Sequence, residues 1–462
     1  MAFVLLFSGT ALAVDTEARE YTAAREAYRQ WYSTVSMEGI MNGMRQLGVR
    51  DNENMFSAQA DYKTLGFTAN QDTPYGAAVL DLSKGPFVIE MPAGPFMGLV
   101  DSHTQGWIID MGIPGQDAGK GGKYLIVPEG YNGLIPQGYF VGRSDTNKVL
   151  VVARIIPEGN DLKKAQARLA DIKIYPLSTA KKPKTLTIVD ISGREGDMTP
   201  LAWESNIQFW QKLAKVINEE PVIKKKQEAY EQLKILGIEK GKAFRPNNSL
   251  RSMLERAARD SQKELLANSF ETAGRPDKLK WTDRKWEWLL LNSKPEWAAD
   301  HDIDPVARDR YFAQALVMSP AMLRRDPTAG SLYWGAFRDS NNNALDGRKS
   351  YKLTVPLPVP ARLFWSVTLY DSDTRSLIAN GTKKSSLRSL VELAEMKGAK
   401  SVDLFFGPQA PAGKEAHWVK TSPGKTWFAY FRIYGPEKAA FDNTWKPGDF
   451  VQIQSESMAL NQ

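Results

Sequence analysis

Two strand-like runs in the last quarter of the chain set the strongest limit on its fold. Phe364 to Asp371 and Thr426 to Pro436 alternate aromatic or β-branched residues with residues that can face water, and each run ends at turn-forming residues. A period of two is typical of strands that lie with one face on a core. We therefore expect the end of the chain to form antiparallel sheet.

A second strand-rich stretch lies between about Thr68 and Leu177. Many short strands at close spacing, without helices between them, predict an antiparallel sandwich or barrel. Each short run is bounded by Gly, Pro, Asn or Asp, which form turns; the runs are Ala77 to Leu82, Phe87 to Met91, Met97 to Asp101, Trp107 to Met111, Tyr124 to Val127, Tyr139 to Gly142 and Val149 to Ile156.

Helical periodicity precedes and separates these two stretches. Apolar residues recur at three- and four-residue steps from Thr16 to about Met44, and again from Pro200 to about Met322. The predicted fold is mainly β with a substantial α section: two antiparallel β-sandwich domains, Ig-like or jelly-roll-like, separated by a helical segment. The expected division is a signal peptide at 1–13, a helical segment at 14–66, a first sandwich at 67–195, a helical section at 196–330 and a second sandwich at 331–462.

The two strand-rich stretches resemble each other. Arg154 and Arg432 each lie within an apolar strand, ten positions after a serine, and earlier strands end at Asp101 and Asp371. Either a repeated sandwich or convergent strand composition explains this pattern. Because an unpaired buried charge is costly, we expect Arg154 to pair with Asp101. By the same reasoning, Arg432 is expected to pair with Asp371.

The first residues resemble a secretory signal. The apolar run Ala2 to Phe7 is followed by Ala11-Leu12-Ala13, whose small outer residues fit a signal-cleavage site. A positively charged start is missing, and a buried N-terminal strand is the alternative interpretation. The signal predicts an exported protein, periplasmic or secreted, that begins at Val14 after cleavage.

Composition excludes several classes of function. None of the 462 residues is cysteine, which excludes disulfides, thiolate metal sites and a cysteine nucleophile. The net charge of +7 is spread along the chain, so no nucleic-acid partner is predicted. No segment after the N-terminal run reaches the roughly 18 apolar residues of a membrane span. The sequence predicts no integral membrane span and leaves the oligomeric state open.

Several blocks of sequence resemble two known families. Asn70 to Gly76, followed by Leu80 to Pro86 and Lys120 to Pro128, is similar to blocks of the family catalogued as domain of unknown function 1254. Leu345 to Asp371 and Trp445 to Asp449 resemble domain of unknown function 1214. The resemblance implies two β-sandwich domains with a helical section between them, in proteins that are often exported. It implies no catalytic residues.

The three histidines, His103, His301 and His417, are dispersed. No two of them have the spacing of a zinc site, and no dinucleotide fingerprint or nucleophile elbow is present, so neither a metal nor a cofactor is predicted. Asp101 and His103 are two residues apart, which places both on one face of a strand. A carboxylate beside an imidazole would orient it as a general base. His417 stands where the resemblance leads us to expect asparagine.

A set of polar and aromatic residues near strand ends forms the predicted site. The catalytic candidates are Asp101, His103 and Tyr75, and the ligand-binding candidates are Asp72, Arg154, Trp365, Tyr370, Asp371 and Arg432. If these side chains converge in one concavity, they would hold a polar small molecule or a glycan. Packing and turn formation are the alternative role for each of them.

Three hypotheses of function follow. The first is an exported protein of the cell envelope that binds a small-molecule or glycan ligand. The second is a metal-independent hydrolase or lyase that uses an Asp, His or Tyr side chain. The third is a structural or assembly protein. A deep pocket that joins Asp101, His103 and Arg154 would favour the enzyme, and an apolar patch on the helices would favour assembly.

Overall fold

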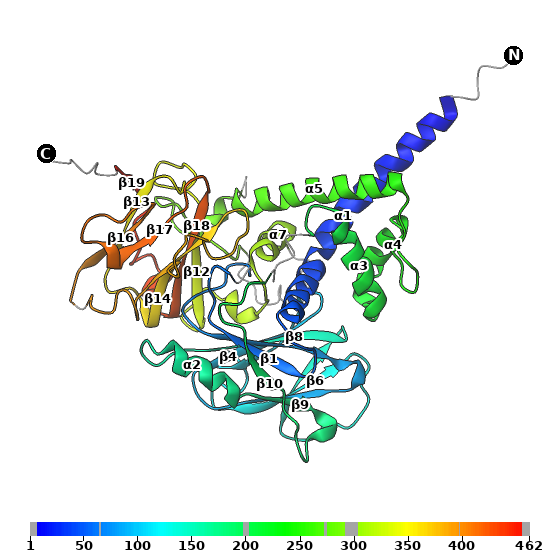
Figure 1. Cartoon of the computed structure of the whole chain (residues 1–462), viewed down its shortest axis with the longest axis horizontal. Coiled ribbons are helices and arrows are strands. Elements are labelled where there is room, and N and C mark those ends of the chain that lie inside the picture. Colours follow the sequence, from blue (N-terminus) through cyan, green and yellow to red (C-terminus); the bar gives the residue numbers. More distant parts are fainter. Residues whose placement is uncertain are drawn as a thin grey trace.

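The computed structural model describes residues 7–63, 66–196, 203–271, 275–291, 304–396 and 398–454, and it describes side chains from residue 17 onward. Residues 1–6 of the predicted signal peptide and His301 lie outside the described residues. Figure 1 shows two groups of strands joined by a cluster of helices, with the N-terminal part of the first helix extending away from the rest.

The first sandwich packs a six-stranded sheet on a four-stranded one. Its core is apolar, with Val100 and Val151 of the larger sheet facing Ile89 and Ile126 of the smaller. The larger sheet has the order β10 (Thr187–Asp190), β1 (Asn54–Ala58), β2 (Tyr75–Asp81), β8 (Lys148–Ile155), β4 (Phe96–Ser102) and β5 (Trp107–Gly112). The smaller has the order β7 (Tyr139–Ser144), β6 (Gly122–Pro128), β3 (Phe87–Met91) and β9 (Lys173–Pro176).

The second sandwich contains the two runs that most limited the fold. They form β14 and β18, which pair antiparallel with Phe364 opposite Tyr434 and Asp371 opposite Trp427. Its five-stranded sheet has the order β11 (Trp286–Trp288), β12 (Ser331–Ala336), β18 (Trp427–Pro436), β14 (Ala361–Asp371) and β15 (Ser386–Arg388). Its four-stranded sheet has the order β17 (Trp418–Lys420), β16 (Ser401–Gly407), β13 (Ser350–Pro356) and β19 (Val451–Ile453).

The two sandwiches share one topology. The order β1-β2-β8-β4-β5 corresponds strand by strand to β11-β12-β18-β14-β15, and β7-β6-β3-β9 corresponds to β17-β16-β13-β19. The correspondence extends to direction, because β6 and β7 are parallel and so are β16 and β17. The mainly β fold with a helical section and the repetition of the sandwich are therefore both confirmed. Arg154 on β8 and Arg432 on β18 lie on corresponding strands.

Most of the helices pack beside the sandwiches and share a core of their own, whereas Ala165 of the short helix at 162–168 packs in the core of the first sandwich. Asn206, Asn247 and Asp304 begin three of them by accepting hydrogen bonds from the first backbone N–H groups. The helices are α1 (Phe7–Gln46), α2 (Leu162–Arg168), α3 (Ile207–Glu219), α4 (Gln227–Ile235), α5 (Asn248–Phe270) and α7 (Pro305–Gln314). Within the described residues, no helix is both long and apolar enough to cross a membrane.

A buried ion pair joins the second sandwich to these helices. Arg375, in the loop between β14 and β15, donates from Nη2 to both carboxylate oxygens of Glu204, at 2.9 and 2.8 Å. Its Nη1 donates to the backbone oxygen of Ala313 at 2.9 Å and lies 3.2 Å from the hydroxyl of Tyr32 on α1. Arg375, Glu204 and Tyr32 are all buried. If either charged partner is removed, the remaining charge has neither an opposite charge nor water to stabilise it.

We predict that Arg375→Met destabilises the protein by about 3–5 kcal/mol, because it leaves the buried Glu204 carboxylate uncompensated. Urea unfolding measures the difference. The double variant Arg375→Met/Glu204→Met should lose less stability than the single variant, since both charges are then removed. A matched control is Lys438→Met, which breaks an exposed pair with Asp442 and should change stability little. Equal losses in Arg375→Met and Lys438→Met would contradict the structural role of the buried pair.

Candidate functional site

A cavity of about 230 Å³ lies between the two sandwiches and the end of the helical section. Its wall includes residues of β2, β4 and β8 from the first sandwich, β12 and β18 from the second, and the segments 66–70 and 314–322. Most of the wall is apolar, with Met44, Leu99, Val152 and Leu316 among its residues. The outer face of the first sandwich packs on α1 here, because Met37, Ile40, Met41 and Met44 contact Phe56, Ala77, Val79 and Leu150.

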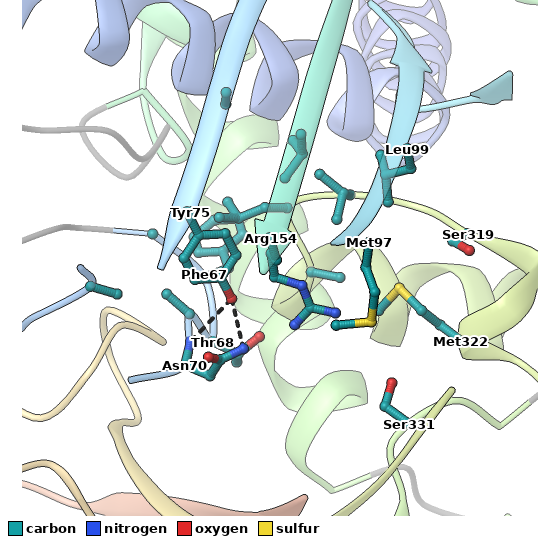
Figure 2. A pocket seen from close by; sticks show the side chains of 18 of the residues that line it. Phe67, Thr68, Asn70, Tyr75, Met97, Leu99, Arg154, Ser319, Met322 and Ser331 are labelled. Carbon is teal, nitrogen blue, oxygen red and sulfur yellow. Dashed lines mark hydrogen bonds between the residues drawn. The ribbon is translucent and has the colours of Figure 1, made fainter. Parts of the chain in front are cut away.

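Two tyrosine–arginine pairs lie at corresponding positions of the two sandwiches. Tyr75 on β2 is the register partner of Arg154 on β8, and the guanidinium carbon lies 5.9 Å from the ring centre. Tyr333 on β12 is the register partner of Arg432 on β18, with a matching distance of 5.7 Å. All four residues line the cavity. In Figure 2 the Arg154 guanidinium reaches into the space between Asn70 and Met322.

Arg432 is buried more deeply than Arg154. Only 3% of Arg432 is exposed, whereas Arg154 is half-buried. Nη2 of Arg432 donates to the backbone oxygen of Thr68 at 2.6 Å, and the rings of Tyr370 and Tyr430 lie 5.4 and 5.2 Å from its guanidinium carbon. Its Nε and Nη1 have no hydrogen-bond partner among the described residues. The aromatic faces stabilise this cation in part.

The segment before β2 is held against the second sandwich. The Tyr370 hydroxyl donates to the backbone oxygen of Ala69 at 2.8 Å. Asp72 accepts from Ser366 Oγ at 2.8 Å and from the Tyr434 hydroxyl at 3.3 Å, and burial raises the pKa of its carboxyl. Asp72 and Tyr370 therefore lie behind the cavity wall and position the segment that carries Thr68.

A carboxylate that sequence analysis missed faces the cavity. Asp110 on β5 lines the wall and accepts from Ser319 Oγ at 3.0 Å. Burial raises its pKa to about 6. Asp101 lies nearby on β4 and accepts from the backbone N–H of Met318 at 2.7 Å, and burial raises its pKa well above the ordinary value. The two carboxyls therefore hold the segment 318–319, Asp101 through a backbone N–H group and Asp110 through the side chain of Ser319.

The predicted Arg–Asp pairs do not form. Met97, not Asp101, is opposite Arg154, so four residues along β4 separate the two positions, a distance of about 13 Å. Asp101 instead accepts from Met318. In the second sandwich Ser366 is opposite Arg432, and the Asp371 carboxylate accepts from Lys425 Nζ at 2.8 Å. Both predicted pairings were wrong. The same spacing along the sequence in the two stretches does not determine which residues lie opposite each other in a sheet, because strand register decides this.

The predicted Asp101–His103 pair does not form either. β4 ends at Ser102 and the chain turns, so His103 enters a buried contact with the helices. Its Nδ1 lies 2.7 Å from Glu220 Oε1 and its Nε2 lies 3.3 Å from Glu38 Oε2. Burial lowers the pKa of His103, but its hydrogen bond to Glu220 and the neighbouring Glu38 carboxylate outweigh this and raise the pKa overall.

The remaining candidate residues lie either in the cavity wall or in the core of the second sandwich. Tyr75, Arg154 and Arg432 line the cavity, whereas Trp365 is a core residue stacked on Phe431 with ring centres 5.4 Å apart. Tyr333 was missed, although the repeat offered a signal for it at the position that corresponds to Tyr75. Within the described ranges, no group of three or more His, Asp or Glu residues is arranged to hold a metal ion.

Family models match both halves of the chain. Residues 53–176 match a family described as protein of unknown function (DUF1254), and residues 330–438 match one described as protein of unknown function (DUF1214). These matches confirm the two resemblances and their order. No curated protein matches the chain.

A solved structure shares this architecture. The crystal structure of the VPA0106 protein from Vibrio parahaemolyticus aligns over 94% of this chain and 100% of its own, with a TM-score of 0.58 and 16% sequence identity. An uncharacterised protein from Burkholderia cenocepacia aligns over 97% of this chain and 98% of its own, with a TM-score of 0.40 and 12% identity. At this identity, the Vibrio structure supports the fold alone.

We predict that Asp110→Asn is more stable than the parent above pH 6. The pKa of Asp110 is raised to about 6, so the folded state binds this proton more tightly than the unfolded state does. Ionisation of Asp110 therefore costs the folded protein up to about 3 kcal/mol at pH 7.5. Urea unfolding should show this gain at pH 7.5 and no gain near pH 4. A gain that is independent of pH would contradict it.

We predict the opposite pH dependence for His103→Gln. Because the pKa of His103 is raised in the folded state, protonated His103 stabilises the fold fully below the unfolded value of about 6.5. This stabilisation is lost as the pH rises through the raised folded-state pKa. The stability difference between parent and variant should therefore be largest at pH 5.5 and smaller at pH 9. Thermal unfolding at both values measures it, and a larger difference at pH 9 would refute the assignment.

Proposed function

We propose that this chain, which pairs a DUF1254 domain with a DUF1214 domain, binds a small and largely apolar molecule in the cavity between its two sandwiches. The observation that carries the proposal is the cavity itself, with a volume of about 230 Å³ and a mainly apolar wall. This volume exceeds the roughly 150 Å³ of a cavity that holds benzene. It lies just below the range of about 300–1,000 Å³ for drug-sized ligands.

The position of the cavity supports binding over a purely structural role. Small-molecule sites often lie where domains meet, and here both sandwiches and the helical section contribute to one wall. A few polar groups, Arg154, Asp110 and Ser319, stand among apolar side chains, which is the composition that gives orientation as well as affinity. The apolar wall favours a ligand with an apolar body over a glycan.

The hydrolase or lyase hypothesis receives less support. His103 is the candidate base of that hypothesis. It contacts Glu220 and Glu38 and does not line the cavity. Asp101 binds a backbone N–H group. Export to the periplasm or beyond belongs to the proposal and is supported by the apolar N-terminal run and the small residues after it.

We predict that Ala321→Trp abolishes binding of N-phenyl-1-naphthylamine, an uncharged dye that fluoresces strongly in apolar surroundings. Ala321 lines the cavity and is half-buried, so an indole there occupies the space. The parent should give a saturable rise in fluorescence. The matched control Ala439→Trp lies on η9 (Lys438–Ala440), outside the cavity wall, and should bind as the parent does. Equal dye binding by Ala321→Trp, with unfolding unchanged, would refute the proposed site.

A further inference from the structure

We infer that the ligand of this cavity carries a carboxylate, which the guanidinium groups of Arg154 and Arg432 receive. The inference rests on the proposed function and names the class of molecule that the site takes. Its starting point is an imbalance of charge in the cavity wall. Among the described residues, no carboxylate lies within ion-pairing distance of either arginine.

Other buried cations in the same protein are matched with a carboxylate. Arg310, which also lines the cavity, lies 2.9 Å from Glu287, and Arg375 lies 2.8 Å from Glu204. Asp110 accepts from Ser319, and Asp72 accepts from Ser366 and Tyr434. The Asp72 carboxyl attracts Arg432 electrostatically without forming an ion pair with it, whereas the charged neighbours of Arg154 within the described part of the chain include no carboxylate. The cavity therefore holds two guanidinium groups, and neither forms with a described residue the direct ion pair that Arg310 and Arg375 form.

The hydrogen-bonding capacity of the two arginines is also incompletely used. Arg432 is 3% exposed, yet its Nε and Nη1 have no hydrogen-bond partner among the described residues. Arg154 lies over the ring of Tyr75 and interacts with the side chain of Tyr333, and its guanidinium extends into the cavity (Figure 2). A planar guanidinium binds a carboxylate through two parallel N–H bonds. A bound carboxylate would therefore supply both the charge and the acceptors.

The repeated topology explains why two arginines converge. Arg154 and Arg432 occupy corresponding strands, and each stands beside a tyrosine in the same register. Because the two sandwiches meet at the cavity, the repeat brings one cation from each domain to a shared space. The body of the ligand would contact the apolar residues Leu99, Val152 and Leu316. The inferred class is thus a carboxylate with a small alkyl or aryl body.

A competition series tests the head group on the unaltered protein. Octanoate, octanol and octylammonium have the same alkyl chain and different heads, and each is titrated at pH 7.5 against bound N-phenyl-1-naphthylamine. We expect octanoate to displace the dye at least about tenfold more effectively than octanol, because hydrogen bonds to a charged group are stronger than those between neutral groups. Octylammonium should be the weakest. Equal displacement by octanoate and octanol would overturn the inference while the proposed function stands.

Variants assign the effect to the arginine. Arg154→Met should lose the preference for octanoate over octanol, measured as the ratio of their displacement constants. Arg154→Lys keeps the charge without the planar donors and should retain part of the preference. Arg362→Met, an exposed position on β14, is the matched control and should behave as the parent. If the parent binds neither the dye nor any member of the series, the proposed function fails and the inference fails with it. An unchanged preference in Arg154→Met would reject the arginine as the anion receptor.

Discussion

The buried ion pair between Arg375 and Glu204 is the interaction on which the cavity depends most. It ties a loop of the second sandwich to the helical section, and the same loop holds the wall of the cavity. The backbone oxygen of Arg375 accepts from the N–H of Thr68 at 2.7 Å, and the guanidinium lies 4.3 Å from the ring centre of Phe67. The backbone oxygen of Thr68 in turn accepts a hydrogen bond from Arg432. The ion pair, which lies outside the cavity, therefore helps to position an arginine of the cavity wall.

A second buried contact does the same for the first sandwich. His103 follows β4 and lies between Glu220, which caps α3, and Glu38 on α1. The two contacts are alike, because each inserts a basic side chain from a sandwich loop among acidic or hydroxyl groups of the helical section. Together they hold two sandwiches against one helical section. Such buried polar contacts are directional, unlike apolar packing, so they restrict how the parts can meet.

Sequence pattern predicted the strands, the helical section and the repeat because these depend on local periodicity. Arg154 and Arg432 were found for the same reason, since charges within apolar strands stand out. Their partners were not found, because partnership depends on strand register, and a shift of four residues moved Asp101 away from Arg154. Asp110 and Glu204 were missed because their environments are created by segments 209 and 171 residues away in the chain. The periodicity of apolar residues within a strand or helix carries no information about contacts between segments so far apart in the chain.

The repeat gives the site its chemical character. In a single sandwich, a buried arginine beside a tyrosine would need a carboxylate of its own, because an unpaired charge in an apolar core is strongly disfavoured. Where two copies face each other across a cavity, solvent or a ligand can meet that need for both. Tyr75 with Arg154, and Tyr333 with Arg432, are thus the same structural unit used twice. Stability alone gives no reason to place two guanidinium groups at one interface without a direct ion pair for either, whereas recognition of an anion does.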